Sequence, residues 1–99
     1  MHIKILDDAK DDILSSTLFY ESQQDGAGDY FLESISSDIE SLHLFAGIHS
    51  LRFAHHTVFS KRFPYTIYYK IDAKCIKIVA VFDDRQNPKK IENRLKGIK

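Results

Sequence analysis

The chain has a single cysteine, Cys75, and no long apolar run. One cysteine excludes an internal disulfide, which is typical of proteins kept in a reducing compartment, and we expect a cytoplasmic location. The first residues, MHIKILDDAKDD, lack the apolar core of a signal peptide, and no stretch approaches the length that a membrane-spanning helix needs. We therefore expect no signal peptide, no transmembrane helix and no membrane partner. Internal repeats and low-complexity segments are also absent from the sequence.

The composition is that of a packed globule. Hydrophobic residues make up 43% of the 99 positions, and seven Phe and five Tyr provide large side chains for a core. We expect one domain over residues 1–99, a size that supports one modest core.

The formal net charge of zero conceals a strong asymmetry. Residues 1–60 contain three Lys or Arg and ten Asp or Glu, whereas residues 61–99 contain eleven Lys or Arg and four Asp or Glu. The first part therefore carries −7 and the second +7. Such a split predicts that the second part meets an anionic partner while the first does not.

The first half of the chain favours two helices. A short strand is expected at Ile3–Leu6, and Asp7 and Asp8 then offer a helix cap and a negative first turn. Helical spacing extends from Ala9 to about Gln24 and ends at a Gly-containing turn, where Asp29 is a candidate cap for a second helix. That helix has an apolar stripe and a polar face of Ser, Asp and Glu, and the stripe comprises Leu32, Ile35, Ile39, Leu42 and Ala46. Gly47 is placed to end it, and we expect the two helices to form an antiparallel hairpin.

The second half favours strands. Leu51–Phe53 and Val58–Phe59 indicate one strand or an irregular pair, followed by alternating residues at Thr66–Asp72. After a turn at Asp72–Cys75, the run Ile76–Phe82 is apolar on both faces, which predicts a central strand with Ile76, Ile78, Ala80 and Phe82 on one side. The last segment, 87–99, predicts a short basic helix with Asn87 as its cap and Pro88 in its first turn. The fold class is therefore α+β, with a helical hairpin on a mostly antiparallel twisted sheet.

This order of elements, together with one motif, resembles the RelE/ParE toxin superfamily of bacterial type II toxin–antitoxin systems, and the ParE-like branch most of all. The motif combines two arginines with two strands and an Arg-x-x-Pro exit, and it covers about a third of the chain: Arg52, Arg62, FPYTIYY (Phe63–Tyr69), IKIVAVF (Ile76–Phe82) and RQNP (Arg85–Pro88). Many relatives place a histidine where Asp83 stands, and some place a second arginine where Gln86 stands.

The resemblance implies a toxin of an addiction system that stabilises plasmids. Such a toxin inhibits growth by binding DNA gyrase, has no catalytic centre, and is neutralised by a cognate antitoxin whose terminal segment wraps the toxin surface. A homodimer or a toxin–antitoxin heterotetramer is the expected assembly. An exposed apolar strip at Leu14, Leu18 or Phe45 would suit the antitoxin segment.

The cations near the strand ends are the candidate target-binding residues. Guanidinium and ammonium groups there can hold phosphates or carboxylates. We expect Arg52, Lys61, Arg62 and Arg85 to converge, and the full candidate set is Arg52, Lys61, Arg62, Arg85, Lys89, Lys90 and Arg94.

Two alternatives stay open: a RelE-like ribosome-dependent mRNA endonuclease, and a non-toxic relative that only binds antitoxin. RNA cleavage needs an acid and a base beside the cations. The candidate catalytic residues would be Arg62, Arg85, Tyr68 and His56, with His55 and Asp83 as further proton-transfer candidates. Tyr68 is also the tyrosine that we expect to be available for stacking on a base. The spacing of the histidines does not predict a metal site, and we expect no cofactor.

Overall fold

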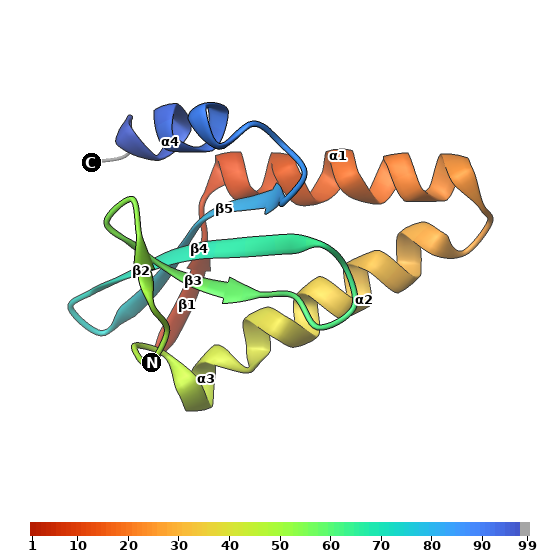
Figure 1. Ribbon diagram of the computed structural model, residues 1–99. Coiled ribbons are helices and arrows are strands. Elements are labelled where there is room, and N and C mark those ends of the chain that lie inside the picture. The colour runs from red at the N-terminus through yellow and green to blue at the C-terminus, as the bar shows by residue number, and fades with distance from the viewer. Residues whose placement is uncertain (98–99) are drawn as a thin grey trace.

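The computed structural model describes residues 1–97, so the last two residues of the segment expected to be helical lie outside the described part. Two long helices cover one face of a sheet, and a shorter helix lies across the other (Figure 1). The elements in chain order are β1 (His2–Ile5), α1 (Asp7–Gln23), α2 (Ala27–Glu40), α3 (Leu42–Phe45), β2 (Leu51–Arg52), β3 (His55–Phe59), β4 (Tyr65–Asp72), β5 (Cys75–Asp83) and α4 (Pro88–Lys96). The predicted α+β class is confirmed.

The five strands form one sheet in the order β1-β5-β4-β3-β2. β1 pairs with β5 in parallel, with Ile3 opposite Ile76, and the other three pairs are antiparallel. As the apolar run Ile76–Phe82 predicted, β5 has a neighbour on each side. Of the two alternatives predicted for the region between the helices and β4, the structure has the pair of strands. β2 is a two-residue strand at the edge of the sheet, and β3 lies between it and β4.

The helical hairpin is closed by contacts between the end of α1 and the start of α2. The Glu21 carboxylate accepts hydrogen bonds from the backbone N–H groups of Gly26 (3.1 Å) and Gly28 (3.0 Å). These bonds satisfy donors that the start of a helix otherwise leaves unpaired. A Cβ on Gly28 would lie 2.8 Å from the Thr17 carbonyl oxygen, so the helices approach at a distance that only glycine permits.

The larger core lies between the hairpin and the sheet. The buried residues of α2 and α3 pack against the inner face of β4 and β5, and they include Phe31, Ile35, Ile39 and Leu42. Three members of the predicted stripe are therefore buried as expected, but Leu32 is exposed and Phe31 takes its place in the core. The helix is also shorter than expected, because it ends at Glu40 and a separate turn of helix follows, and Gly47, at φ 93°, ends that region.

The smaller core lies between α4 and the other face of the sheet. It contains Tyr68, Phe82, Ile91 and Leu95. The strict alternation predicted for β5 is wrong in its second half. A register shift between Tyr68 and Tyr69, which pair with Ala80 and Ile78, leaves Val79 as an extra residue. This bulge moves Ala80 and Phe82 to the α4 face, away from Ile76 and Ile78.

The cap predicted for α4 is present in the structure, whereas the cap predicted for α1 is not. The Asn87 side chain accepts a hydrogen bond from the backbone N–H of Lys89 at 2.8 Å, as predicted for the start of α4. Asp7 and Asp8 lie in the first turn of α1, but the cap position is Leu6, which provides no side-chain bond. Within residues 1–97, no helix combines the length and apolar character needed to cross a membrane.

Candidate functional site

Strand register separates the predicted cations into two groups. Tyr65 pairs with Asp83 and Phe59 with Thr66, so the loop containing Lys61 and Arg62 and the segment containing Arg85 follow strand ends at the same end of the sheet. Arg52 pairs with His55, the first residue of β3, and therefore lies toward the opposite end. Lys61, Arg62 and Arg85 therefore lie toward one end of the sheet and Arg52 toward the other.

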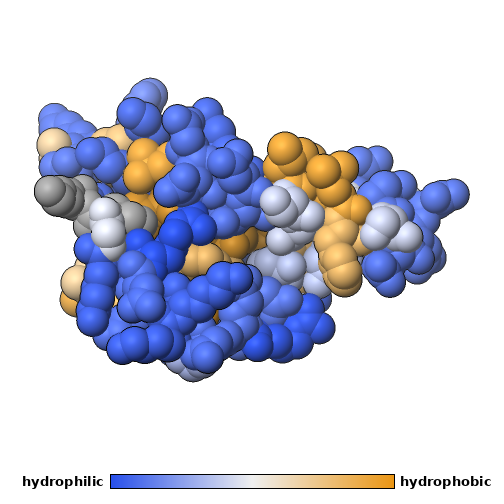
Figure 2. Space-filling model, turned by 90° about the horizontal axis from the view of Figure 1, so that it is seen from above, coloured by the Kyte–Doolittle hydropathy of each residue, from blue (hydrophilic) through white to orange (hydrophobic). Residues whose placement is uncertain are grey.

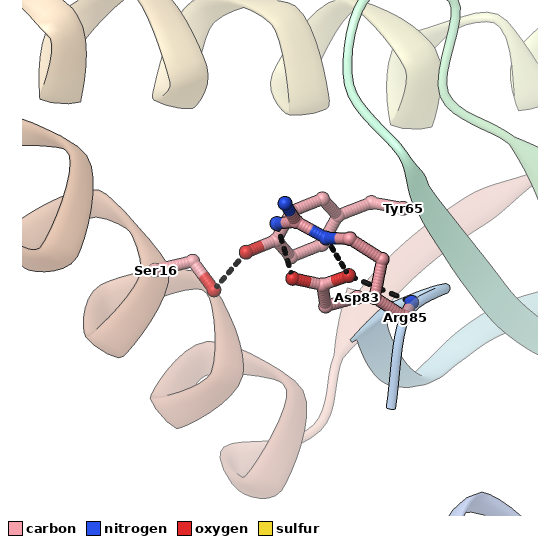
Figure 3. Close-up of polar contacts among 4 residues, drawn as sticks. All are labelled: Ser16, Tyr65, Asp83 and Arg85. Carbon is pink, nitrogen blue, oxygen red and sulfur yellow. Dashed lines mark hydrogen bonds and ion pairs between the residues drawn. The ribbon is translucent and has the colours of Figure 1, made fainter. Parts of the chain in front are cut away.

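Arg85 is held by Asp83, two residues before it in the chain. Its Nε donates to Asp83 Oδ1 at 2.9 Å, its Nη2 donates to Oδ2 at 2.6 Å, and its backbone N–H donates to Oδ1 at 2.8 Å (Figure 3). These bonds to the Arg85 guanidinium hold the pKa of Asp83 below its usual range. The Arg85 side chain is still 66% exposed, so it is oriented by Asp83 and open to a partner.

A tyrosine and a serine stand beside this ion pair. Figure 3 shows the Tyr65 ring next to the Arg85 guanidinium, with its hydroxyl pointing toward α1. The Tyr65 hydroxyl donates to Ser16 Oγ at 3.1 Å and ties β4 to the hairpin. Burial raises the pKa of Tyr65, so this hydroxyl stays protonated at neutral pH.

Arg52 belongs to a different environment. Its Nη1 lies 3.4 Å from the Tyr68 hydroxyl, and its guanidinium lies 4.8 Å from the centre of the Phe53 ring. Tyr68 is only 1% exposed and packs with Phe82. The expectation that Tyr68 is available for stacking on a base is therefore wrong, because α4 covers the face of the sheet that bears its ring.

Of the three candidate cations in α4, one is bonded within the fold and two are exposed. Arg94 makes two bonds of 3.0 Å to the Asp12 carboxylate of α1 and lies over the Phe82 ring at 5.0 Å. Lys89 and Lys90 are exposed, and Lys89 lies 3.9 Å from Glu92. Arg94 therefore attaches α4 to the rest of the molecule, whereas the two lysines face outward.

The histidines that could transfer protons lie away from Arg62 and Arg85, whereas the other candidate, Asp83, is bonded to Arg85. His56 stacks on Tyr69 and bonds to the His49 carbonyl at 2.8 Å, while buried His55 bonds to the Phe53 carbonyl at 2.7 Å. Both histidines begin β3, at the end of the sheet opposite the loop with Arg62. In the described part of the chain, no cluster of three or more His, Cys, Asp or Glu could hold a metal ion.

A second surface, the apolar groove, lies on the hairpin. It has a volume of about 390 Å³ and is lined mainly by Ile5, Ile13, Leu14, Thr17, Leu32 and Ile39. Leu14 and Leu18 are 57% and 61% exposed, and Figure 2 shows a patch of apolar side chains over α1. The strip expected at Leu14 and Leu18 is thus on the surface, but the groove also needs Leu32, which the sequence pattern assigned to the core.

The fold is shared with a protein of known structure. A solved chain of the chromosomal ParDE TA (toxin–antitoxin) system from P. aeruginosa superposes with a TM-score of 0.70, covering 84% of this chain and 95% of that one. The two sequences are 17% identical, so the likeness is one of fold. Neither a protein-family model nor a curated protein matches the sequence.

Proposed function

We propose that this protein is the toxin component of a type II toxin–antitoxin system, and that it inhibits growth in the cytoplasm by binding a target, with DNA gyrase as the first candidate. The observation that carries the proposal is the likeness of fold to a chain of a ParDE system, which extends over 84% of this protein. The gyrase target follows from the resemblance of the RFPYTIYY and RQNP motifs to ParE-like toxins.

The geometry favours a contact surface over a nuclease site. The cations at one end of the sheet are accompanied by Asp83, whose pKa is lowered, and by Tyr65, whose pKa is raised. At neutral pH Asp83 is ionised, and its lowered pKa makes it a weak base. Tyr65 is protonated, and its raised pKa makes it a weak acid, so both are moved away from the range that suits proton transfer. His56 and Tyr68 make their hydrogen bonds elsewhere in the fold. The exposed Lys61, Arg62 and Arg85 are suited to gripping anionic groups on a partner.

The apolar groove supports a neutralising partner. Its walls are apolar, and Lys10 and Glu40 also line it. An amphipathic helix that becomes ordered on binding could place one apolar face in such a groove. The antitoxin would then cover the hairpin, a surface distinct from the cationic end of the sheet.

Inducible expression in bacteria tests the toxin proposal. We expect growth arrest, with altered plasmid supercoiling by gyrase and intact messenger RNA. Arg62→Ala and Arg85→Ala should each relieve the arrest, whereas Lys74→Ala, at an exposed lysine of the β4–β5 turn, should not. Circular dichroism of each variant controls for folding. Cleaved message on translating ribosomes would overturn the proposal in favour of a nuclease, and unaffected growth would leave only a non-toxic binder.

A charge placed in the groove tests the antitoxin surface. Leu14→Asp should leave toxicity intact, because the side chain is more than half exposed, and should abolish rescue by a co-expressed cognate antitoxin. Leu44→Asp, at a residue of α3 that is 82% exposed and outside the groove, is the matched control and should still be rescued. Rescue of both variants would show that the antitoxin binds elsewhere.

A further inference from the structure

Charge compensation sets Arg85 apart from the other two exposed cations at its end of the sheet. Within residues 1–97, neither Lys61 nor Arg62 makes an ion pair, and the guanidinium carbon of Arg62 lies 5.8 Å from the centre of the Tyr30 ring. Arg85 instead donates to both carboxylate oxygens of Asp83, at 2.9 and 2.6 Å (Figure 3). The exposed cations are therefore of two kinds, two that are uncompensated and one that a carboxylate holds.

The charge that Arg85 presents to a partner is offset by its neighbours in the chain. The bonds between the two side chains lower the pKa of Asp83 and raise the pKa of Arg85, so both groups are charged at neutral pH. Asp84 lies between them in the chain and is exposed, so two carboxylates accompany one guanidinium. A phosphate that approaches Arg85 therefore also meets two negative groups, whose repulsion offsets the attraction.

The planar guanidinium determines which of its N–H groups are left for a partner. Nε and Nη2 face Asp83, so the carboxylate occupies one side of the fork. The remaining N–H groups belong to Nη1 and Nη2, and the two that lie along the outer edge are parallel and point away from Asp83. The Tyr65 ring lies beside the guanidinium with its hydroxyl turned to Ser16, and Tyr20 approaches it from α1. Since the side chain is 66% exposed, a partner can reach it.

An uncharged acceptor fits this group better than an anion does. A carbonyl oxygen accepts hydrogen bonds through two lone pairs and brings no charge for Asp83 and Asp84 to repel. Nucleic-acid bases also have uncharged acceptors, but each base is attached to a phosphate backbone that the two carboxylates repel. Backbone carbonyls that lack a partner occur on protein surfaces, for example in the last turn of a helix. The chemistry around Arg85 therefore favours a protein over a nucleic acid.

We propose that Arg85 binds uncharged backbone carbonyl oxygens of a partner protein, and that Asp83 is the positioning residue that fixes its guanidinium and excludes phosphates from it. Lys61 and Arg62 keep their role as contacts for anionic groups, and Arg85 has a different acceptor. The inference deepens the proposed function and rests on it for the partner, which is the target of the toxin. The exclusion of phosphate is a property of the isolated chain, so it is measured without reference to toxicity.

Binding of a labelled single-stranded DNA oligonucleotide to the purified full chain tests the exclusion. Affinity is measured by fluorescence anisotropy over a series of KCl concentrations. Asp83→Asn leaves the guanidinium uncompensated, so Arg85 should gain a phosphate. We expect tighter binding at low salt, and a slope of log affinity against log salt that is steeper by about 0.7, the value for one more phosphate contact on a single strand. Arg85→Ala in the otherwise unsubstituted chain should leave the slope unchanged, because Arg85 holds no phosphate while Asp83 compensates it.

Two further variants control for net charge and for the group that gains the contact. Asp25→Asn removes one exposed carboxylate in the hairpin turn and should leave the slope unchanged, as should Asp83→Asn combined with Arg85→Ala. An unchanged slope in Asp83→Asn, or a slope that falls by about 0.7 in Arg85→Ala, would overturn the proposal. The second result would make Arg85 a phosphate contact and favour a nucleic-acid partner. Circular dichroism controls for folding, and the Arg85→Ala slope decides alone if Asp83→Asn does not fold.

Growth arrest in the inducible expression assay tests the carbonyl contact. Lysine keeps the charge at position 85 but cannot present a planar pair of N–H donors. Arg85→Lys should therefore relieve the arrest as fully as Arg85→Ala, and Lys74→Ala should not relieve it. Arrest that persists in Arg85→Lys would show that a point charge is sufficient and would overturn the oriented contact. If the unsubstituted chain arrests no growth, the proposed function fails, whereas the oligonucleotide slopes still decide whether Asp83 excludes phosphate.

Discussion

Two carboxylates on the helical hairpin, Asp12 of α1 and Asp38 of α2, have opposite surroundings. Asp12 receives two hydrogen bonds of 3.0 Å from Arg94 and a third, also of 3.0 Å, from the backbone N–H of Val81. Asp38 is buried more deeply, yet its Oδ2 has no partner and neither Lys61 nor Arg62 pairs with it. Both oxygens of Asp12 accept hydrogen bonds within the chain, whereas Oδ2 of Asp38 accepts none.

The difference separates a carboxylate that links several elements from one that links none. Asp12 joins three elements, α1, β5 and α4, and its bonds fix α4 over the smaller core. Asp38 contributes no such link, and the burial of its Oδ2 without a partner lowers stability. Substitution of each carboxylate should therefore change the free energy of unfolding in opposite directions.

The largest effect is expected from Asp12→Ala. Removing this carboxylate leaves the Arg94 guanidinium and the Val81 N–H without their acceptor in a region that is mostly buried. We expect the free energy of unfolding, measured in urea, to fall by about 3 kcal/mol. Asp11→Ala removes an exposed charge one residue away and should change it by less than about 0.5 kcal/mol. Equal effects of the two substitutions would show that the Asp12 bonds are not structural.

A smaller effect of opposite sign is expected from Asp38→Asn. The amide keeps the shape of the side chain and removes a buried charge that has no partner. The free energy of unfolding should rise by about 1 kcal/mol. A loss of stability in the variant would mean that Asp38 already has a partner in solution.

The sequence predicted the type and order of most elements, but it did not predict the surroundings of these two carboxylates. Apolar periodicity predicted the helical hairpin, and the Asn87-Pro88 pair predicted the start of α4, because both signals are local. Asp38 lies on the face of its helix that looked solvated, and it is buried because a loop more than twenty residues later covers it. The bond between Asp12 and Arg94 spans 82 positions and has no local signal. Asp83 and Arg85 are two residues apart, but only the geometry shows that the carboxylate orients the cation.

The smallest expected effect is the pH dependence of stability that arises from two carboxylates, Asp12 and Asp83. Burial raises the pKa of Asp12 by more than the bonds from Arg94 and Val81 lower it, whereas the bonds from Arg85 lower the pKa of Asp83. An unfolded Asp titrates near 3.9. As the pH falls through the raised pKa of Asp12 toward that value, the folded state takes up the proton first, so Asp12 makes folding more favourable. Below that value Asp83 acts in the opposite direction, because its stabilisation is lost as the pH falls through its own lowered pKa.

Carboxyl carbon NMR titration measures both groups in one sample. We expect the Asp12 midpoint above the ordinary range and the Asp83 midpoint below it. Arg85→Gln should return Asp83 to the ordinary range and leave Asp12 unchanged, because Arg85 makes no bond to Asp12. If both midpoints shifted in the same direction, burial would not dominate at Asp12, and its bonds to Arg94 would be strong enough to keep the carboxylate ionised. The contrast with Asp38 would then be wider, since one buried carboxylate would be fully compensated by the chain and the other not at all.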